Sequence, residues 1–178
     1  NELFGDTDLK GGNPMTAKFH GSHLLPNGDL LLALSYIGVV RLDACGNVVW
    51  TLAEGNHHSI TRAEDGTFWM SAVSAERHTM TPQHPEGFPG LNRSVWMDRL
   101  LHVSGDGRVL QDINVLEVLY ANGLERYVRK AHAQGAYTPE NGDPTHLNDV
   151  EPLSSSMASE YPRFETGDVV VSLKHPNL

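Results

Sequence analysis

Short apolar runs alternate with turns rich in Asp, Asn and Gly along most of this chain. The run Leu30–Leu34 follows the turn Asn27-Gly28, and the run Phe68–Ser71 follows Asp65-Gly66. Apolar runs of four to eight residues bounded by such turns are typical of β-strands. The pattern therefore predicts a mainly β chain.

A histidine recurs at a fixed place before these strands. His20 and His58 each stand eight residues before a turn glycine, and the two glycines, Gly28 and Gly66, are 38 residues apart. A third copy begins at His146 and carries an insertion before its turn. Four short strands in about 40 residues are typical of a β-propeller blade. The sequence thus predicts an all-β fold of the β-propeller type, with a β-sandwich as the alternative.

Two further hairpins and two interruptions complete the pattern. Residues 39–50 and 100–110 each form a short strand, a Gly-containing turn and another short strand, which indicates a hairpin. Residues 75–99 are expected to form a long loop insertion. Residues 112–134 are expected to form a helical insertion, which Asn122-Gly123 divides into two short helices. Residues 1–178 as a whole are interpreted as one partial β-propeller domain.

The length of the chain limits the number of blades. At roughly 40 residues per blade, the chain has room for about three to four blades once the insertions are subtracted. A half-open propeller would expose strand edges, which proteins avoid. We therefore expect a fragment or one of several pieces of a closed ring. Its partners would be the remaining propeller blades, from the same parent chain or from a second chain, and the oligomeric state is left open.

Composition narrows the classes of function. Hydrophobic residues make up 39% and charged residues 20% of the chain, which excludes a disordered chain. No apolar run approaches the roughly 20 residues that a membrane-spanning helix needs. The net charge of −9 argues against nucleic acid or acidic lipid as a partner, so an anionic ligand would have to be bound by a local cluster. The single cysteine, Cys45, lies in a turn and is interpreted as a plain turn residue.

Candidate chemistry gathers where the apolar strands begin and end. His146 and Asn148 are two residues apart at the start of one expected strand, so their side chains should share a face, roughly 7 Å apart. By the same alternation Ser172 and Lys174 should share a face at the end of the next strand. All four side chains can donate hydrogen bonds to an anion.

The repeat also predicts that three histidines converge. In a propeller the innermost strand of each blade begins near the central channel, and His20, His58 and His146 hold that position in the repeat. Converging imidazoles can bind an oxyanion, ligate a metal or transfer a group covalently. The sequence therefore predicts a histidine-lined site in the channel.

We expect neither a metal nor a cofactor there. Adjacent strand residues point to opposite faces, so His57 and His58 should not ligate one ion together. No Cys or His-x-His pair supports zinc, and Asp149 and Glu151 lack a calcium-binding loop. Besides an enzyme that acts on anions, two readings stay open. One is a non-catalytic propeller that binds protein or carbohydrate; the other is a hydrolase or lyase that uses a channel histidine with Asp149 or Glu151.

Parts of the chain resemble a known family. The segment Asn56-His57-His58-Ser59-Ile60 resembles the His-His-Asp-Ile segment of the arylsulfotransferase (arylsulfate sulfotransferase) family. Residues 143–150, with His146-Leu147-Asn148, and residues 167–174, with Ser172-Leu173-Lys174, resemble its His-x-Asn strand and the Ser-x-Arg strand after it. The likeness runs from about Gly21 to the end of the chain and is specific over residues 143–175.

The resemblance implies a six-bladed propeller in the periplasm or another extracytoplasmic location, with or without a membrane anchor in the full-length protein. It would move a sulfuryl group from a phenolic sulfate ester to a phenol acceptor through a sulfated histidine, without a nucleotide sulfate donor. Its partners would be small aryl sulfates and phenols. By matching motif, the resemblance places His146 and Asn148 at the sulfate oxygens, and His58, with His57 second to it, in the same channel. Taken with the repeat, the candidate catalytic residues are His146 and His58, and the candidate substrate-binding residues are Asn148, Lys174, His57, His20 and His175.

The chain departs from the family pattern in two ways. Lys174 stands where the family has arginine, and a lysine cannot make the bidentate grip of a guanidinium on an oxyanion. The covalent histidine of the family lies in a later blade, so we expect the nucleophile outside these residues. The chain alone is then not expected to complete a turnover.

Overall fold

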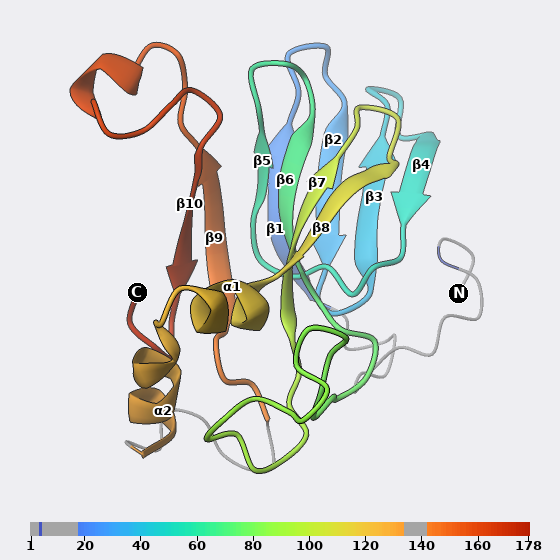
Figure 1. Ribbon diagram of the computed structural model, residues 1–178. Coiled ribbons are helices and arrows are strands. Elements are labelled where there is room, and N and C mark those ends of the chain that lie inside the picture. The colour runs from blue at the N-terminus through green and yellow to red at the C-terminus, as the bar shows by residue number, and fades with distance from the viewer. Residues whose placement is uncertain (1–3, 5–17, 134–141) are drawn as a thin grey trace.

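The strands form three antiparallel sheets (Figure 1). The computed structural model describes residue 4 and residues 18–133 and 142–178. The first sheet contains, in spatial order, β1 (Phe19–Leu24), β2 (Leu30–Leu34), β3 (Gly38–Leu42) and β4 (Val48–Leu52). The second contains β5 (Ile60–Arg62), β6 (Phe68–Val73), β7 (Asp98–Val103) and β8 (Val109–Asn114). The third pairs β9 (Leu147–Pro152) with β10 (Val169–Leu173).

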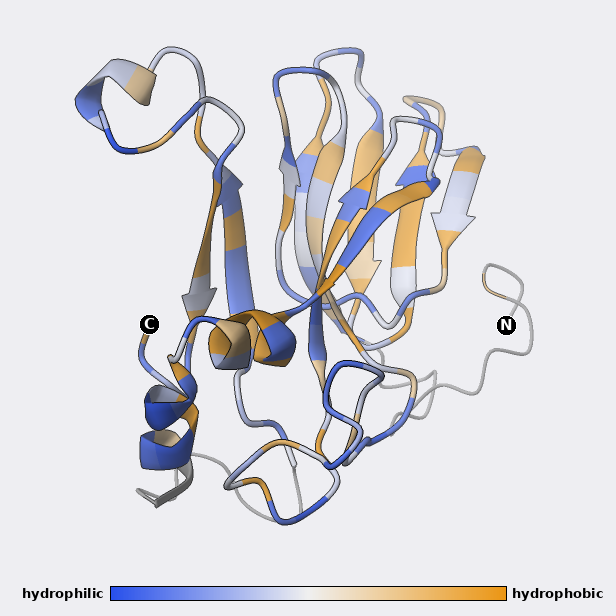
Figure 2. Cartoon of the chain, in the orientation of Figure 1, coloured by the Kyte–Doolittle hydropathy of each residue, from blue (hydrophilic) through white to orange (hydrophobic). Residues whose placement is uncertain are grey.

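The helices lie between the second and third sheets in the chain. They are α1 (Val115–Ala121) and α2 (Glu125–Ala133), and a short 3₁₀ helix spans Ala158–Glu160. Asn114 caps α1 by accepting a hydrogen bond from the backbone N–H of Glu117. The prediction of two short helices on either side of Asn122-Gly123 is confirmed. Figure 2 shows α2 as mostly hydrophilic, and no described helix is both long and apolar enough to span a membrane.

Strand β6 is buried along its whole length because sheets pack on both of its faces. Its alternate residues Phe68, Met70 and Ala72 join a core with the first sheet. The residue between them, Trp69, belongs to a second core that includes Leu116 of α1 and Val150 of β9. Because side chains alternate between the two faces of a strand, β6 contributes to two separate cores, and the three sheets stack face to face around them.

The all-β prediction is confirmed at the level of the sheets. Two sheets have four strands each in a simple up-and-down order, and the third has two strands. Strand β1 packs beside β5, and β9 packs beside β5 and β6, so the first strands of the three sheets are neighbours. The described residues form no closed ring of sheets: they contain two four-stranded sheets and one two-stranded sheet, so the propeller itself stays a prediction.

Each sheet has two ends of different character. The turns that follow β1, β3, β5 and β7 lie together at what we call the turn end, at the top of Figure 1. The chain enters β1, β5 and β9 at the opposite end, which we call the histidine end because His20, His58 and His146 lie there.

The long connection between β6 and β7 also lies at the histidine end (Figure 1). It spans residues 74–97 and carries an isolated pair of bridging residues, His78 and Val95. The Trp96 backbone N–H donates to the Gly142 carbonyl at 2.8 Å. The connection therefore braces the segment that leads into His146.

Candidate functional site

Five histidines form a continuous cluster at the histidine end. The ring of His58 lies at its centre, with centroids 4.0 Å from His20, 5.0 Å from His57 and 5.1 Å from His146. The ring of His175 stacks on that of His146 at 5.0 Å with an interplanar angle of 27°. The structure thus brings together the three repeat histidines and both neighbours that the sequence assigned to the site.

The backbone at two of these histidines is strained. His58 has φ 54° and His146 has φ 52°, in the left-handed region that side chains other than glycine rarely occupy. Each precedes its strand: β5 begins at Ile60 and β9 at Leu147. The expectation that His146 and Asn148 share a strand face was therefore wrong. It assumed that both residues lie in the strand, but the alternation of faces does not extend to a residue in a left-handed turn.

The same reasoning corrects the view of the His57-His58 pair. Both residues lie in the loop before β5 rather than in a strand, and the left-handed turn at His58 brings the two rings edge to face at 5.0 Å. The loop is fixed by β6, since the hydroxyl of Ser71 donates to the His57 carbonyl and the His57 N–H donates to the Ser71 carbonyl at 3.3 Å.

Gly21 explains how His20 and His58 come so close. A Cβ at Gly21 would overlap the carbonyl oxygen of His58, so only glycine lets β1 approach this loop. The pairing of β1 with β2 is also irregular between Phe19 and Gly21. The close approach places the neighbouring His20 ring against the His58 ring.

Asp143 organises the other side of the cluster. Its carboxylate accepts the His146 backbone N–H at 2.9 Å and contacts the His146 ring at Nδ1. Its backbone carbonyl lies 2.7 Å from the His175 ring at Nδ1. In addition, the Lys174 N–H donates to the His146 carbonyl at 3.1 Å. The turn after β10 is therefore tied to the turn before β9.

Asp98 is a second carboxylate beside the cluster and is buried, with 3% exposure. It accepts hydrogen bonds from the Thr145 hydroxyl at 2.6 Å and the Leu147 N–H at 2.8 Å. Its other oxygen lies 3.3 Å from Nε2 of the buried His57. Asp98 thus connects the start of β7, the start of β9 and the histidine loop.

The central imidazole is neutral at physiological pH. Burial, together with the charges of His57, His20, His146 and Lys174, lowers the pKa of His58 from 6.5 to about 3. Its Nε2 is buried and makes no hydrogen bond with any described residue, and the same holds for Nδ1 of His57. Buried polar atoms without a partner are rare in proteins and are suited to a ligand.

The remaining predicted residues lie at the rim. Asn148 is the second residue of β9 and is half-buried, opposite an irregularity in the β9–β10 pairing between Ser172 and Leu173. Lys174 is exposed and follows the last residue of β10, so the expected shared strand face of Ser172 and Lys174 is also wrong. The charge of Lys174 nevertheless contributes, as the smallest of several causes, to the lowered pKa of His58.

Sequence reasoning missed Tyr36 and the roles of the two carboxylates. Tyr36 lies in the turn between β2 and β3 with φ 61°, and its ring is 5.2 Å from that of His57. Burial and the charges of Asp143 and Asp98 raise the pKa of Tyr36, so its phenol stays protonated and can donate a hydrogen bond. The signal available in the sequence was weak: only Asp143, three residues before His146, has the spacing of a local side-chain cap.

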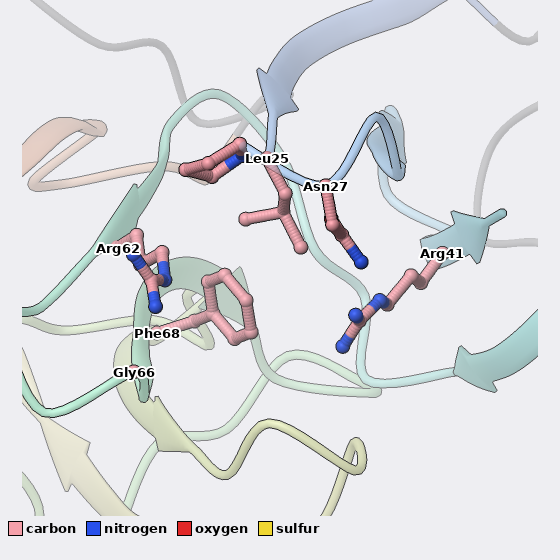
Figure 3. Close-up of a pocket in the computed structure, with 7 residues that line it drawn as sticks. Leu25, Asn27, Arg41, Arg62, Gly66 and Phe68 are labelled. Atoms are coloured by element: carbon pink, nitrogen blue, oxygen red, sulfur yellow. The ribbon is translucent and has the colours of Figure 1, made fainter. Parts of the chain in front are cut away.

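A second hollow lies at the turn end, between the first and second sheets (Figure 3). It has a volume of about 230 Å³, with Leu25 and Phe68 as apolar walls and the guanidinium groups of Arg41 and Arg62 beside them. Arg41 is already occupied, because it donates to Asp29 at 2.6 and 2.9 Å and to the Gly105 carbonyl at 2.8 Å. The hollow therefore lacks the convergent free donors of the histidine cluster.

The cluster has the chemistry of an oxyanion site. Imidazoles, a phenol and an amide can donate hydrogen bonds, and Lys174 supplies positive charge. The carboxylates of Asp143 and Asp98 face donors of the protein itself, which limits their repulsion of an anion. Within the described residues no group of three or more His, Cys, Asp or Glu side chains has the geometry to hold a metal ion.

Comparison with known families decides the assignment. The sequence profile of the family described as "Arylsulfotransferase (ASST)" matches residues 21–178, nearly the whole chain. The chain belongs to the arylsulfotransferase family. The matched region contains His57, His58, His146, His175 and both carboxylates, so most of the cluster belongs to this family domain.

Other comparisons add little to the family assignment. A crystal structure described as a protein of unknown function from Bacteroides caccae matches the arylsulfotransferase-family chain with 12% identity and a TM-score of 0.31. That match covers 57% of this chain and 33% of the other, so the aligned part is about a third of the length of that protein. No curated protein matches the chain.

Proposed function

We propose that this chain forms part of an arylsulfotransferase propeller and holds the sulfuryl group of an aryl sulfate during its transfer to a phenol acceptor. The observation that carries the proposal is the imidazole cluster centred on His58, in which buried ring nitrogens have no hydrogen-bond partner among the described residues. Membership of the family supplies the substrate class.

Each group has a role in this proposal. His58 and His146 contact the sulfuryl oxygens from two sides, and Asn148 and Lys174 contact them from the rim. The oxygens of a sulfuryl group carry negative charge throughout the transfer, so donors already in place lower the barrier. Lys174 supplies charge to one oxygen only, since an ammonium cannot grip two oxygens as a guanidinium does.

In this proposal the sheets belong to a closed six-bladed propeller. The first two sheets are complete blades, and the two-stranded third sheet is the inner half of the next blade, completed from the same parent chain or from a second chain. The stacking of three sheets with adjacent first strands supports this arrangement. The nucleophilic histidine would lie on a further blade that faces the cluster. An extracytoplasmic location is proposed from the family resemblance alone.

Binding of 4-nitrophenyl sulfate, followed by calorimetry, tests the role of this chain. We expect saturable binding that is at least tenfold weaker in His146→Ala, while 4-nitrophenol itself binds weakly. In the intact protein we expect release of 4-nitrophenol that depends on an added phenol acceptor. Unchanged binding by His146→Ala together with no transfer would exclude the proposal. Release without any acceptor would instead establish a hydrolase.

A further inference from the structure

Asp143 holds two histidines of the cluster at the same time. Its side chain holds His146 through both the backbone N–H and the ring Nδ1, and its main chain holds the ring of His175. The two rings stack on each other, so one residue sets the orientation of both. The family resemblance assigned no role to this carboxylate.

The charge state of Asp143 decides which ring nitrogen of His146 carries hydrogen. Burial alone raises the pKa of Asp143, but the hydrogen bonds from His146 and the positive charge of His146 and His175 bring its net pKa below the ordinary value. An ionised carboxylate only accepts hydrogen bonds, so Nδ1 of His146 must be the donor. Nε2 is therefore the ring nitrogen that is left to exchange a proton with the substrate.

We propose that Asp143 is a positioning residue that fixes His146 as the proton carrier of the site, with Nδ1–H held by the carboxylate and Nε2 available to the reacting oxygens. This inference rests on the proposed function. In the overall exchange the S–O bond to the donor phenolate breaks and an S–O bond to the acceptor oxygen forms. One proton must pass from the acceptor hydroxyl to the departing phenolate.

His146 accounts for that proton. Nε2 gives a proton to the departing phenolate and takes one from the acceptor phenol, so atoms and charge balance over the full exchange. This proton count is the same whether or not the sulfuryl group stops on another histidine. General acid–base catalysis of this kind contributes typically about 10²- to 10⁴-fold.

The other central histidine is not suited to this task. His58 has no carboxylate partner at hydrogen-bond distance among the described residues, and its ring is neutral at pH 7 because burial lowers its pKa to about 3. It can donate one hydrogen bond to a sulfuryl oxygen but does not arrive with a proton to give. The two residues that the sequence assigned together to catalysis thus have different roles.

The substitution Asp143→Asn tests this inference. An asparagine can still accept the His146 backbone N–H, but its amide then presents hydrogen to Nδ1 and favours the opposite tautomer of the ring. In ¹⁵N spectra of the histidine rings we expect the His146 signals to change from the Nδ1–H pattern in wild type to the Nε2–H pattern in the variant. The His175 signals should stay, because its partner is the backbone carbonyl of residue 143.

The matched control is Asp168→Asn at the other end of the same hairpin. Asp168 also accepts a backbone N–H three residues away, that of Glu165 at 2.9 Å, and contacts no histidine. We expect it to leave the His146 signals and sulfuryl transfer unchanged, and Asp143→Asn to lower kcat for transfer on the order of 100-fold with KM within about threefold.

The outcomes separate this inference from the proposed function. An unchanged His146 tautomer in Asp143→Asn overturns the positioning role, whatever the activity of the protein. A changed tautomer with an unchanged kcat overturns the role of His146 as proton carrier. If the wild-type protein transfers no sulfuryl group at all, the proposed function fails, and the ring spectra still decide whether Asp143 orients His146.

Discussion

The two ends of the sheets differ in which residues adopt the left-handed backbone conformation where the chain reverses direction. At the turn end, each hairpin turn after β1, β3, β5 and β7 places a glycine in the left-handed region: Gly28, Gly46, Gly66 and Gly107. At the histidine end the same conformation falls on glycines such as Gly55 and Gly142 and also on residues with large side chains: Tyr36, His58 and His146. Three of the four non-glycine residues with positive φ in the described chain thus lie in or beside the histidine cluster.

Hydrogen bonding differs between the ends in the same way. In the turn after β3 the carboxylate of Asp43 accepts from Asn47 and Cys45, and its pKa is lowered by these hydrogen bonds. In the loop before β5, by contrast, Nδ1 of His57 and Nε2 of His58 are buried without a partner among the described residues. Backbone strain of about 1–3 kcal/mol per residue and unpaired polar atoms gather at functional sites. The contrast therefore supports the proposal that the site lies at the histidine end.

The largest expected effect comes from Gly21→Ala. The added methyl group would overlap the His58 carbonyl, so β1 must move away from the loop and His20 must separate from His58. We expect a loss of stability on the order of 3 kcal/mol by urea unfolding and loss of aryl-sulfate binding.

The control for this substitution is Gly105→Ala at the turn end. A Cβ there would meet only the Gly66 carbonyl at 3.6 Å, an ordinary contact, and the φ of Gly105 is not in the left-handed region. We expect stability and binding close to wild type. Equal losses in both variants would show that the close approach at Gly21 has no special role.

His58→Asn separates strain from function. Asparagine tolerates the left-handed conformation better than most residues, so the free energy of unfolding should stay within about 1 kcal/mol of wild type. Aryl-sulfate binding should weaken at least tenfold in calorimetry. Gly66→Ala, where φ is 87°, should do the reverse and cost about 1 kcal/mol without changing binding. Strong destabilisation by His58→Asn would remove the argument from strain.

The buried His58 at the histidine end should also make the free energy of unfolding depend on pH. The pKa of His58 is lowered from the ordinary 6.5 to about 3 in the folded chain. Between about pH 6.5 and pH 3 the imidazole is therefore protonated in the unfolded chain but neutral in the folded chain. Stability should fall as the pH drops through this window, and the fall should be shallower in His58→Asn. Thermal unfolding between pH 7 and 4 measures the difference, and parallel curves for the two proteins would contradict it.

The smallest effect is expected from Arg62→Gln in the turn-end hollow. Arg62 is exposed and lies beside Gly66, at the end of β5 that leads into the turn-end hairpin. Binding of 4-nitrophenyl sulfate should be unchanged within the error of calorimetry. A loss comparable to that of His58→Asn would move the anion site to the hollow.

The sequence predicted what depends on local pattern and missed what depends on distant partners. The apolar run Leu30–Leu34 is a strand with the predicted bounds, and Asn122-Gly123 separates two helices. The repeat also predicted that His20, His58 and His146 meet. The positive φ at His58 and His146 has no signature in residue type, so the alternation rule was applied where no strand exists.

The missed residues show the same limit. Asp98 begins an apolar strand and lies 47 residues before Thr145, so nothing in its surroundings indicates that contact. Tyr36 stands in a plain turn, and only the stacking of the first two sheets brings its ring to His57. These contacts depend on tertiary packing between residues far apart in the chain, and no local sequence pattern predicts it.

The most direct test of the histidine end as the anion site is a titration of the ¹⁵N-labelled chain with 4-nitrophenyl sulfate, observed at the histidine rings. The reference is His102, which stacks on Trp69 and contacts Thr67 near the turn end. We predict saturable shifts in the ring signals of His58 and His146, with His102 unaffected. Unshifted His58 and His146 signals at saturating ligand, or shifts confined to His102, would contradict the account.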